Sequence, residues 1–217
     1  MMVDNPGIDS TVKLCLQAQG EDGSTNFFDK SQSRRIITRY GNTQITNDKS
    51  IFQDNSIKFS GDGDYLEIES YSDLTLSGDF GIGFFAYFTS IGAFQRIVTS
   101  ALGTLPSPMW AIRLSNSNRL QVVMEATIVN STVTIQSGRW YYVCVSREGN
   151  TMSMSIDGII QATQTISGTP DPARYIGGYY TGSTSSPEYL KGYLDDLIIR
   201  IGKPIDPTIV PSRRTGT

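Results

Sequence analysis

The side chains of this sequence that could do chemistry are mostly carboxylates, because the chain contains no histidine. Histidine is the usual general base, zinc ligand and pH switch, so its absence excludes serine and cysteine nucleophiles of the histidine-assisted type. Glu67 and Glu69 are separated by one residue, and on a strand such a pair shares one face. Paired carboxylates can flank a glycosidic bond, but solvated strand acids are the favoured interpretation here. Glu125 stands alone.

A second group of carboxylates raises the question of a metal. Asp195 lies in an apolar segment where strict alternation places it on the same face as Leu197 and Ile199. A buried carboxylate needs hydrogen bonds or a cation to offset its loss of hydration, and backbone N–H groups of a neighbouring loop are the favoured partners. The alternative is a Ca²⁺ site shared with Asp62 or Asp64, since oxygen ligands from a glycine-rich loop suit that ion.

Aromatic side chains supply a third candidate chemistry, the stacking of sugar rings on aromatic faces. Tyr179, Tyr180 and Tyr189 flank a polar loop over residues 181–188, and Trp110 follows a Pro-Ser-Pro-Met segment. We predict these four residues as ligand-binding candidates, although structural packing is the favoured interpretation of the tyrosines. Trp140 is expected in the core.

The elements that must position these residues are strands. Residues 139–158 contain an aromatic strand, a Glu-Gly-Asn turn, an alternating strand and an Asp-Gly turn, which are two hairpin signals in succession. Residues 79–88 are almost continuously apolar, with glycines two apart, and predict a central strand that other segments approach closely. Further alternating segments are expected as strands: 12–17, 56–59, 65–69, 96–100, 109–114, 119–125, 127–135, 161–166, 175–180 and 193–201.

This pattern predicts an all-β protein with roughly twelve to fourteen strands in two stacked antiparallel sheets and at most one short helical turn. No linker divides the chain, so we expect one domain over residues 1–205 and an irregular tail over 206–217, which contains few pattern signals. The outer strands of such a sandwich must be protected or used for association, so the chain could form a homo-oligomer.

Composition excludes several classes of partner. The net charge is −3 and cations are not clustered, so nucleic acid is not expected as a partner. No segment is long and apolar enough to span a membrane, and the first residues lack the pattern of a secretory signal. Cys15 and Cys144 form no metal motif and are expected to be unpaired structural thiols.

Four segments taken in order resemble the laminin-G and concanavalin A-like lectin/glucanase superfamily. They lie at residues 13–31, 57–82, 140–158 and 177–199, and include the Gly-Asp-Gly-Asp turn at 61–64, the Trp140 hairpin and Leu-Asp-Asp-Leu at 194–197. The resemblance implies a jelly-roll β-sandwich. It also implies that glycosidases of this fold carry three acids on one strand, a pattern that Glu67 and Glu69 do not complete.

The sequence is similar to single-domain members found in bacteriophage structural proteins. That resemblance implies a non-enzymatic virion protein, on the capsid surface or a tail fibre, assembled in the host cytoplasm. Its partners would be other virion proteins or host-surface glycans, with no cofactor except a Ca²⁺ ion in some relatives. The alternative is a carbohydrate-binding module of a larger polysaccharide-acting assembly.

Overall fold

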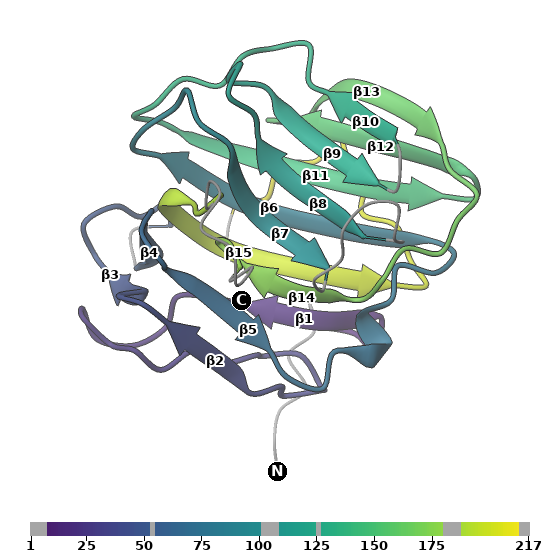
Figure 1. Ribbon diagram of the computed structural model, residues 1–217. Helices are drawn as coiled ribbons and strands as arrows, with labels where there is room; N and C mark the ends of the chain where they lie inside the picture. Colours follow the sequence, from purple (N-terminus) through teal and green to yellow (C-terminus); the bar gives the residue numbers. More distant parts are fainter. Residues whose placement is uncertain (1–7, 53–54, 101–108, 125–126, 180–187, 213–217) are drawn as a thin grey trace.

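The computed structural model describes residues 8–52, 55–100, 109–124, 127–179 and 188–212, and these form a sandwich of two antiparallel sheets (Figure 1). The one helix among the described residues is the single 3₁₀ turn η1 (Ser72–Leu74). The expected all-β class and two-sheet architecture are therefore confirmed.

One sheet has eight strands. Its path runs β13 (Ile159–Thr165), β12 (Thr151–Ile156), β11 (Trp140–Glu148), β6 (Phe80–Phe88), β15 (Lys191–Ile201), β4 (Ser56–Ser60) and β3 (Gln44–Thr46), and β1 (Val12–Leu16) also pairs with β15. The β11–β12–β13 hairpins confirm the two turns predicted over residues 139–158. At the second turn Asp157 and Gly158 both have positive φ, as the predicted Asp-Gly turn requires.

The other sheet has seven strands. Its order is β10 (Thr127–Asn130), β9 (Leu120–Met124), β8 (Trp110–Leu114), β7 (Gln95–Ser100), β14 (Ala173–Ile176), β5 (Tyr65–Ile68) and β2 (Ile37–Tyr40). Figure 1 shows this sheet in front of the eight-stranded one, with β13 and β10 toward the upper right and β2 and β3 toward the lower left.

The core lies between the sheets and follows from strand alternation. In β6 the even-numbered residues Phe80, Ile82, Phe84, Ala86 and Phe88 all belong to the main hydrophobic cluster. The odd positions face away from the second sheet, and glycine occupies two of them because other segments approach closely. A Cβ on Gly81 would lie 2.5 Å from Ile205, and one on Gly83 would lie 2.6 Å from the Tyr142 hydroxyl oxygen.

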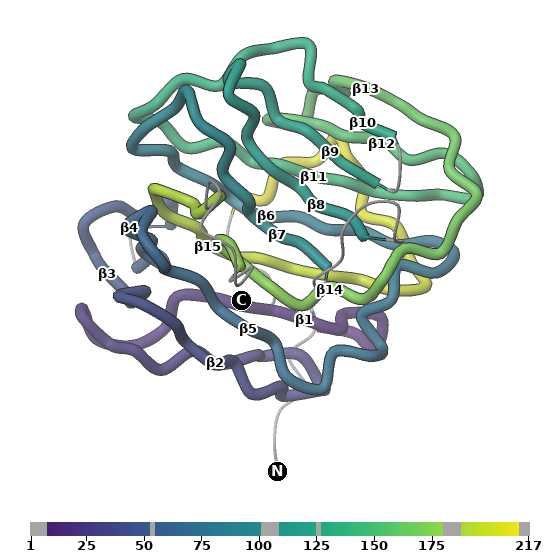
Figure 2. Tube along the Cα trace, in the orientation of Figure 1, coloured from purple at the N-terminus to yellow at the C-terminus, as the bar shows by residue number. Residues whose placement is uncertain are grey.

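The outer side of the eight-stranded sheet is covered by the segment after β15. Ile205 donates its backbone N–H to Ser146 Oγ at 3.0 Å and packs near Phe85 and Tyr142. Part of this segment is the yellow tube behind β11 and β6 in Figure 2. Cys15 and Cys144 are buried in this outer layer and are not joined by a disulfide, as expected, and burial raises the pKa of the Cys144 thiol to about 12.

Two strand predictions were wrong in extent. The alternation over 127–135 forms a strand only to Asn130, because Ser131 Oγ turns inward, accepting from Leu120 N at 3.1 Å. The segment predicted at 175–180 is a strand at Ala173–Ile176, and it ends where Gly177 takes a φ of +81°.

Candidate functional site: a tyrosine face on the seven-stranded sheet

The candidate site lies on the outer face of the seven-stranded sheet and begins with the alternation of β5. Leu66 and Ile68 point into the main core, so Tyr65 and Glu67 point to the opposite face. Tyr40 of β2 pairs directly with Tyr65, and Tyr175 of β14 pairs directly with Glu67. The strand order β14–β5–β2 thus brings residues from three distant parts of the sequence into adjacent rows.

The rings of these residues contact one another. Tyr40 and Tyr65 stack with centroids 4.3 Å apart and planes 7° apart. Tyr65 also meets Tyr175 edge-on at 6.0 Å and Tyr189 in a stacked arrangement at 6.3 Å. Tyr179 lies 6.1 Å from Tyr175. We call these five residues the tyrosine face.

Two consecutive glycines bring Tyr179 and Tyr189 to the other three rings. Gly177 has a φ of +81°, and a Cβ there would lie 2.2 Å from the ring of Phe59. A Cβ on Gly178 would lie 2.3 Å from the ring of Tyr189. Leu190 donates its N–H to the Gly177 carbonyl at 2.8 Å, so the residues on either side of the polar loop lie next to each other. Only glycine permits both approaches at this turn.

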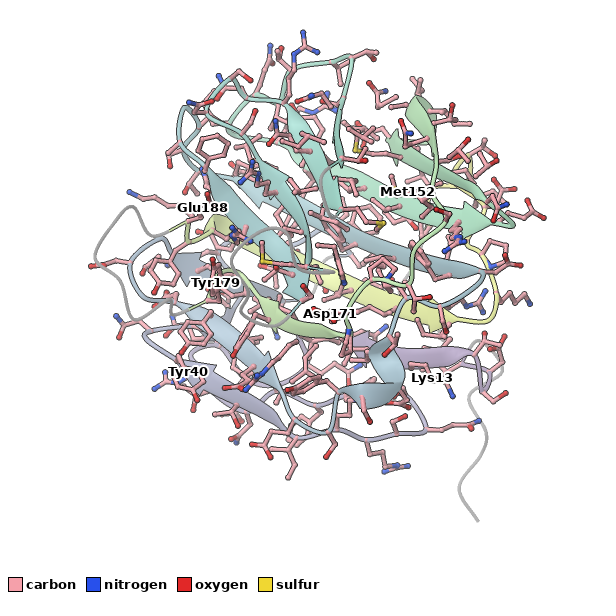
Figure 3. All side chains as sticks on the ribbon, turned by 45° about the vertical axis from the view of Figure 1, so that its right-hand side comes forward. Lys13, Tyr40, Met152, Asp171, Tyr179 and Glu188 are labelled. Carbon is pink, nitrogen blue, oxygen red and sulfur yellow. The ribbon has the colours of Figure 1, made fainter. Side chains whose placement is uncertain are left out.

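Charged side chains hold the tyrosine face from both ends. Glu67 accepts hydrogen bonds from Tyr40 Oη at 3.0 Å and from Arg174 Nε at 2.9 Å. At the other end, Glu188 forms an ion pair with Arg96 Nε at 2.7 Å. The Arg96 guanidinium lies over the Tyr179 ring at 4.6 Å. Figure 3 shows Tyr40, Tyr179 and Glu188 along one side of the molecule.

The five tyrosines differ in accessibility. Tyr65 and Tyr175 are buried, Tyr179 and Tyr189 are half-buried, and Tyr40 is exposed. Burial raises the pKa of Tyr65 to about 12 and raises that of Tyr175, while the hydrogen bond to Glu67 raises the pKa of Tyr40. Tyr40, Tyr65 and Tyr175 are therefore neutral at physiological pH. Tyr40, Tyr179 and Tyr189 present ring surface to solvent, and Tyr65 and Tyr175 connect them through ring contacts.

Asp64, predicted as a metal ligand, instead joins two turns beside the tyrosine face. It is 1% exposed, and its Oδ1 accepts from Asn42 N at 2.5 Å while Oδ2 accepts from Ser60 N at 2.6 Å. Asn42 lies in the turn after β2, and Ser60 is the last residue of β4. Gly41 has a φ of +66°, and a Cβ there would lie 2.3 Å from Asp64 Oδ1. Only glycine at position 41 therefore leaves room for the Asp64 carboxylate.

Asp195 does not share a site with the other two aspartates. A β-bulge lies between Asp195 and Ile198, and Leu194 and Leu197 both belong to the main core. The predicted strict alternation is therefore wrong, and Asp195 does not share the face of Leu197 and Ile199. Asp195 is 1% exposed, and its Oδ1 accepts the N–H of Asp196 at 2.8 Å.

Asp195 also lies apart from the turn that contains Asp62 and Asp64. Ser60, which Asp64 binds, pairs with Lys191, four positions along β15 from Asp195 and so roughly 13 Å away. Asp62 is exposed in its turn. In the described part of the chain no three histidine, cysteine, aspartate or glutamate side chains group together as metal ligands.

The two tryptophans lie in the opposite locations to those predicted, with Trp110 in the core and Trp140 on an outer face. Trp110 is 1% exposed in the main core, and its Nε1 donates to the Asp171 carbonyl at 2.6 Å, so its ring is not available for stacking by a ligand. Trp140 is half-buried on the outer side of the other sheet, edge-on to Tyr87 at 5.5 Å. Tyr180 and Glu125 lie outside the described residues.

The tyrosine face thus contains two predicted residues, Tyr179 and Tyr189, and three that the sequence analysis missed. Tyr65 carried a usable signal, because Tyr65-Leu66-Glu67-Ile68 alternates and places the tyrosine and the glutamate together opposite the apolar residues. Tyr40 and Tyr175 carried none, since their position beside Tyr65 depends on which strands pair.

A cavity of about 600 Å³ lies outside this face. It is formed by the segment from Thr25 to Ile37 with Ile8. Its charged centre is structural, because the Asp29 carboxylate accepts from the backbone N–H groups of Cys15 and Ser31 and contacts Arg35 at 3.5 Å. None of the five tyrosines lines it.

Comparison with known proteins agrees with this architecture. A model of the concanavalin A-like lectin/glucanases superfamily matches residues 60–200, well over half of the chain. The chain belongs to this superfamily. No curated protein matches the sequence.

Solved structures that share this fold include a domain of an arabinanase and two toxins. Domain 4 of AbnA, an extracellular arabinanase from Geobacillus stearothermophilus solved with arabinotriose, is 13% identical, with a TM-score of 0.65 over 91% of this chain and 97% of that one. A structure of botulinum neurotoxin type C, whose cell entry depends on two ganglioside molecules, is 14% identical, with a TM-score of 0.65 over 93% of this chain. The binding domain of Paraclostridial mosquitocidal protein 1 is 13% identical, with a TM-score of 0.67 over 91% of this chain.

This chain spans only half the length of the two toxin chains. At these identities the likeness shows a shared fold. No helix in the described residues is both long and apolar enough to cross a membrane.

Proposed function

We propose that this chain is a non-enzymatic glycan-binding domain and that the tyrosine face is its binding surface. One observation carries the proposal: five tyrosines from four segments form a continuous ring network on an outer sheet face, with three rings open to solvent. Aromatic faces match the apolar faces of pyranose rings. The fixed carboxylates Glu67 and Glu188 can accept hydrogen bonds from sugar hydroxyl groups beside them.

Binding rather than hydrolysis fits the carboxylates of this face. Glu67 is held by Arg174 and Tyr40, and Glu188 by Arg96 and Arg113, so each is already engaged as an acceptor. Glu69 accepts from the Thr38 hydroxyl at 2.6 Å. A glycosidase needs a carboxyl group placed to give a proton to the glycosidic oxygen beside a second one, whereas Glu67 and Glu188 are each directed at arginine side chains.

A glycan array probed with the full chain tests this proposal, followed by titration of the strongest hit. Tyr179→Ala and Tyr40→Ala each remove one solvent-facing ring and should weaken binding roughly two- to tenfold, the range of one aromatic contact. Tyr87→Ala is the matched control, because Tyr87 is also half-buried but lies on β6 in the other sheet. Absence of any array hit, or equal weakening in Tyr87→Ala, would refute the assignment.

We further propose that the glycan is on a host surface and that the chain acts on a virion, as a capsid decoration or tail-fibre protein. The similarity of the sequence to phage structural proteins supports this role. Mass spectrometry of purified virions measures it: hundreds of copies indicate decoration, and a few to a few dozen indicate fibres. Absence from the particles would contradict the proposal.

A second candidate function is a carbohydrate-binding module of a polysaccharide-acting assembly. It is favoured by the fold match to the arabinanase domain solved with arabinotriose, which extends over 97% of that domain. Pull-down of soluble arabinan and related polysaccharides separates the two functions. Selective binding to such a polymer, together with absence from virions, would favour the module.

A further inference from the structure

The end of the sandwich opposite the tyrosine face has an unusual composition. β10 ends the seven-stranded sheet and β13 ends the eight-stranded sheet, and the two strands lie close together. Residues 127–138 and 159–169, which include both strands and the segments after them, contain no charged residue and no proline. Charged residues make up 18% of the whole chain. We call these two segments the uncharged edge.

The uncharged edge exposes aliphatic side chains. Ile128, Val133, Ile159 and Ile160 are each between 44% and 67% exposed. Gln161 connects the two segments, since its Oε1 accepts from Thr132 Oγ1 at 2.6 Å and from Val133 N at 3.2 Å. The two sheet ends therefore form one surface.

The outer backbone of β13 pairs with no other strand among the described residues. Free edges of this kind are normally blocked by lysine, by proline or by an inward-pointing charge, because they otherwise pair with another strand. β13 has only one of the common protective features, the bulge at Gln161 opposite Met154 and Ser155. The straight segment Ala162–Thr165 beyond that bulge remains open for pairing.

We propose that the uncharged edge is the interface of a homodimer in which β13 pairs antiparallel with β13 of a second copy about a twofold axis. An antiparallel strand pair is self-complementary, because each copy offers the same alternating N–H and C=O groups to the other. Two identical charged surfaces repel each other across a twofold axis, whereas this edge has no charge to repel an identical partner. The exposed isoleucines at the start of β13 become buried in the same contact.

The position of the uncharged edge leaves the tyrosine face free. β10 and β13 lie at one end of their sheets, whereas β2, β5 and β14 carry the tyrosines at the other end (Figure 1). A dimer formed at β13 would therefore present two tyrosine faces pointing away from the shared edge. Two linked sites raise the apparent affinity for a multivalent surface above that of one site.

Sedimentation velocity of the full chain across about a hundredfold range of concentration tests the dimer. We expect a reversible monomer–dimer equilibrium. Ile159→Lys should raise the dimer dissociation constant at least about a hundredfold, because the change occurs in both copies and places a cation in the apolar surface that each copy buries on pairing. Ile36→Lys is the matched control, since Ile36 is 66% exposed and Ile159 is 67% exposed but Ile36 precedes β2 at the other end.

Circular dichroism and a melting curve confirm that each variant folds. If Ile159→Lys fails to fold, Thr163→Lys places the charge on an exposed position of the straight part of β13 and must give the same dissociation. A chain that stays monomeric at every concentration overturns the proposal, as does a dimer that Ile159→Lys and Thr163→Lys leave intact. Either result leaves the glycan-binding proposal untouched, because Tyr179→Ala and Tyr40→Ala test the tyrosine face whether the chain is a monomer or a dimer.

Discussion

Replacing Asp64 with alanine removes a carboxylate that joins the turns after β2 and β4. Its two oxygens accept the backbone N–H groups of Asn42 and Ser60 at 2.5 and 2.6 Å. Tyr40 and Tyr65 are the residues next to these turns and stack directly on each other. Asp64→Ala should therefore destabilise the fold and also loosen the tyrosine face.

The size of the effect follows from those two bonds. A hydrogen bond to a charged group contributes about 1.5–3 kcal/mol, and the lower value applies here because Asn42 and Ser60 are near solvent. Two bonds give about 3 kcal/mol for Asp64→Ala, and Asp64→Asn, which keeps one acceptor oxygen, should lose about half of that. For a domain of this length, about 3 kcal/mol lowers the melting temperature by roughly 6–12 °C.

Urea unfolding of the wild type, Asp64→Ala and Asp64→Asn gives the free-energy differences directly. Asp62→Ala is the matched control, because Asp62 is exposed in the same turn, and it should change stability by less than about 0.5 kcal/mol. Thermal melting of the wild type with Ca²⁺ and with a chelator should give the same melting temperature. A loss below about 1 kcal/mol in Asp64→Ala would refute the role of the two bonds, and a rise in melting temperature with Ca²⁺ would support the metal hypothesis.

Two further predictions concern the same region. Gly177→Ala should cost about 2–4 kcal/mol, because φ is +81° and its Cβ would lie 2.2 Å from the buried Phe59 ring. Gly149→Ala, with positive φ but open space around it, should cost only about 1 kcal/mol, and equal losses in urea unfolding would contradict the packing argument. Because the folded pKa of Tyr65 is raised from 10.0 to about 12, its contribution to stability is complete below pH 10 and is lost as pH rises through about 12. Tyr65→Phe should flatten that alkaline decline of the urea midpoint, and an unchanged decline would show that other groups cause it.

The strands were the predictable part of this protein, for a physical reason. Alternation is a local property, so Phe80–Phe88 and the hairpin after Trp140 could be located from neighbouring residues alone. Local turn chemistry was equally informative, because Asp157 and Gly158 take the positive φ angles that their types favour.

Which face of a strand is buried was less predictable. In β11 Trp140 and Tyr142 share one face and Tyr141 the other, and both faces are largely covered, so alternation alone could not say which one meets the second sheet. The same ambiguity placed Trp110 at the surface in the prediction, whereas it is in the core. At Asp195 the β-bulge breaks the alternation on which the prediction depended.

The candidate site was only partly predictable, because its members meet through strand order and not through sequence spacing. Tyr179 and Tyr189 could be selected as a pair, since they flank one loop. Tyr65 adjoins them only because β14 pairs with β5, and Tyr40 adjoins Tyr65 only because β5 pairs with β2. The chemistry of the face follows from that pairing: the rings of distant segments form one surface, and Glu67 binds Arg174 of β14 together with Tyr40 of β2. A substitution that weakens either strand pairing should therefore reduce glycan binding even where no ring is removed.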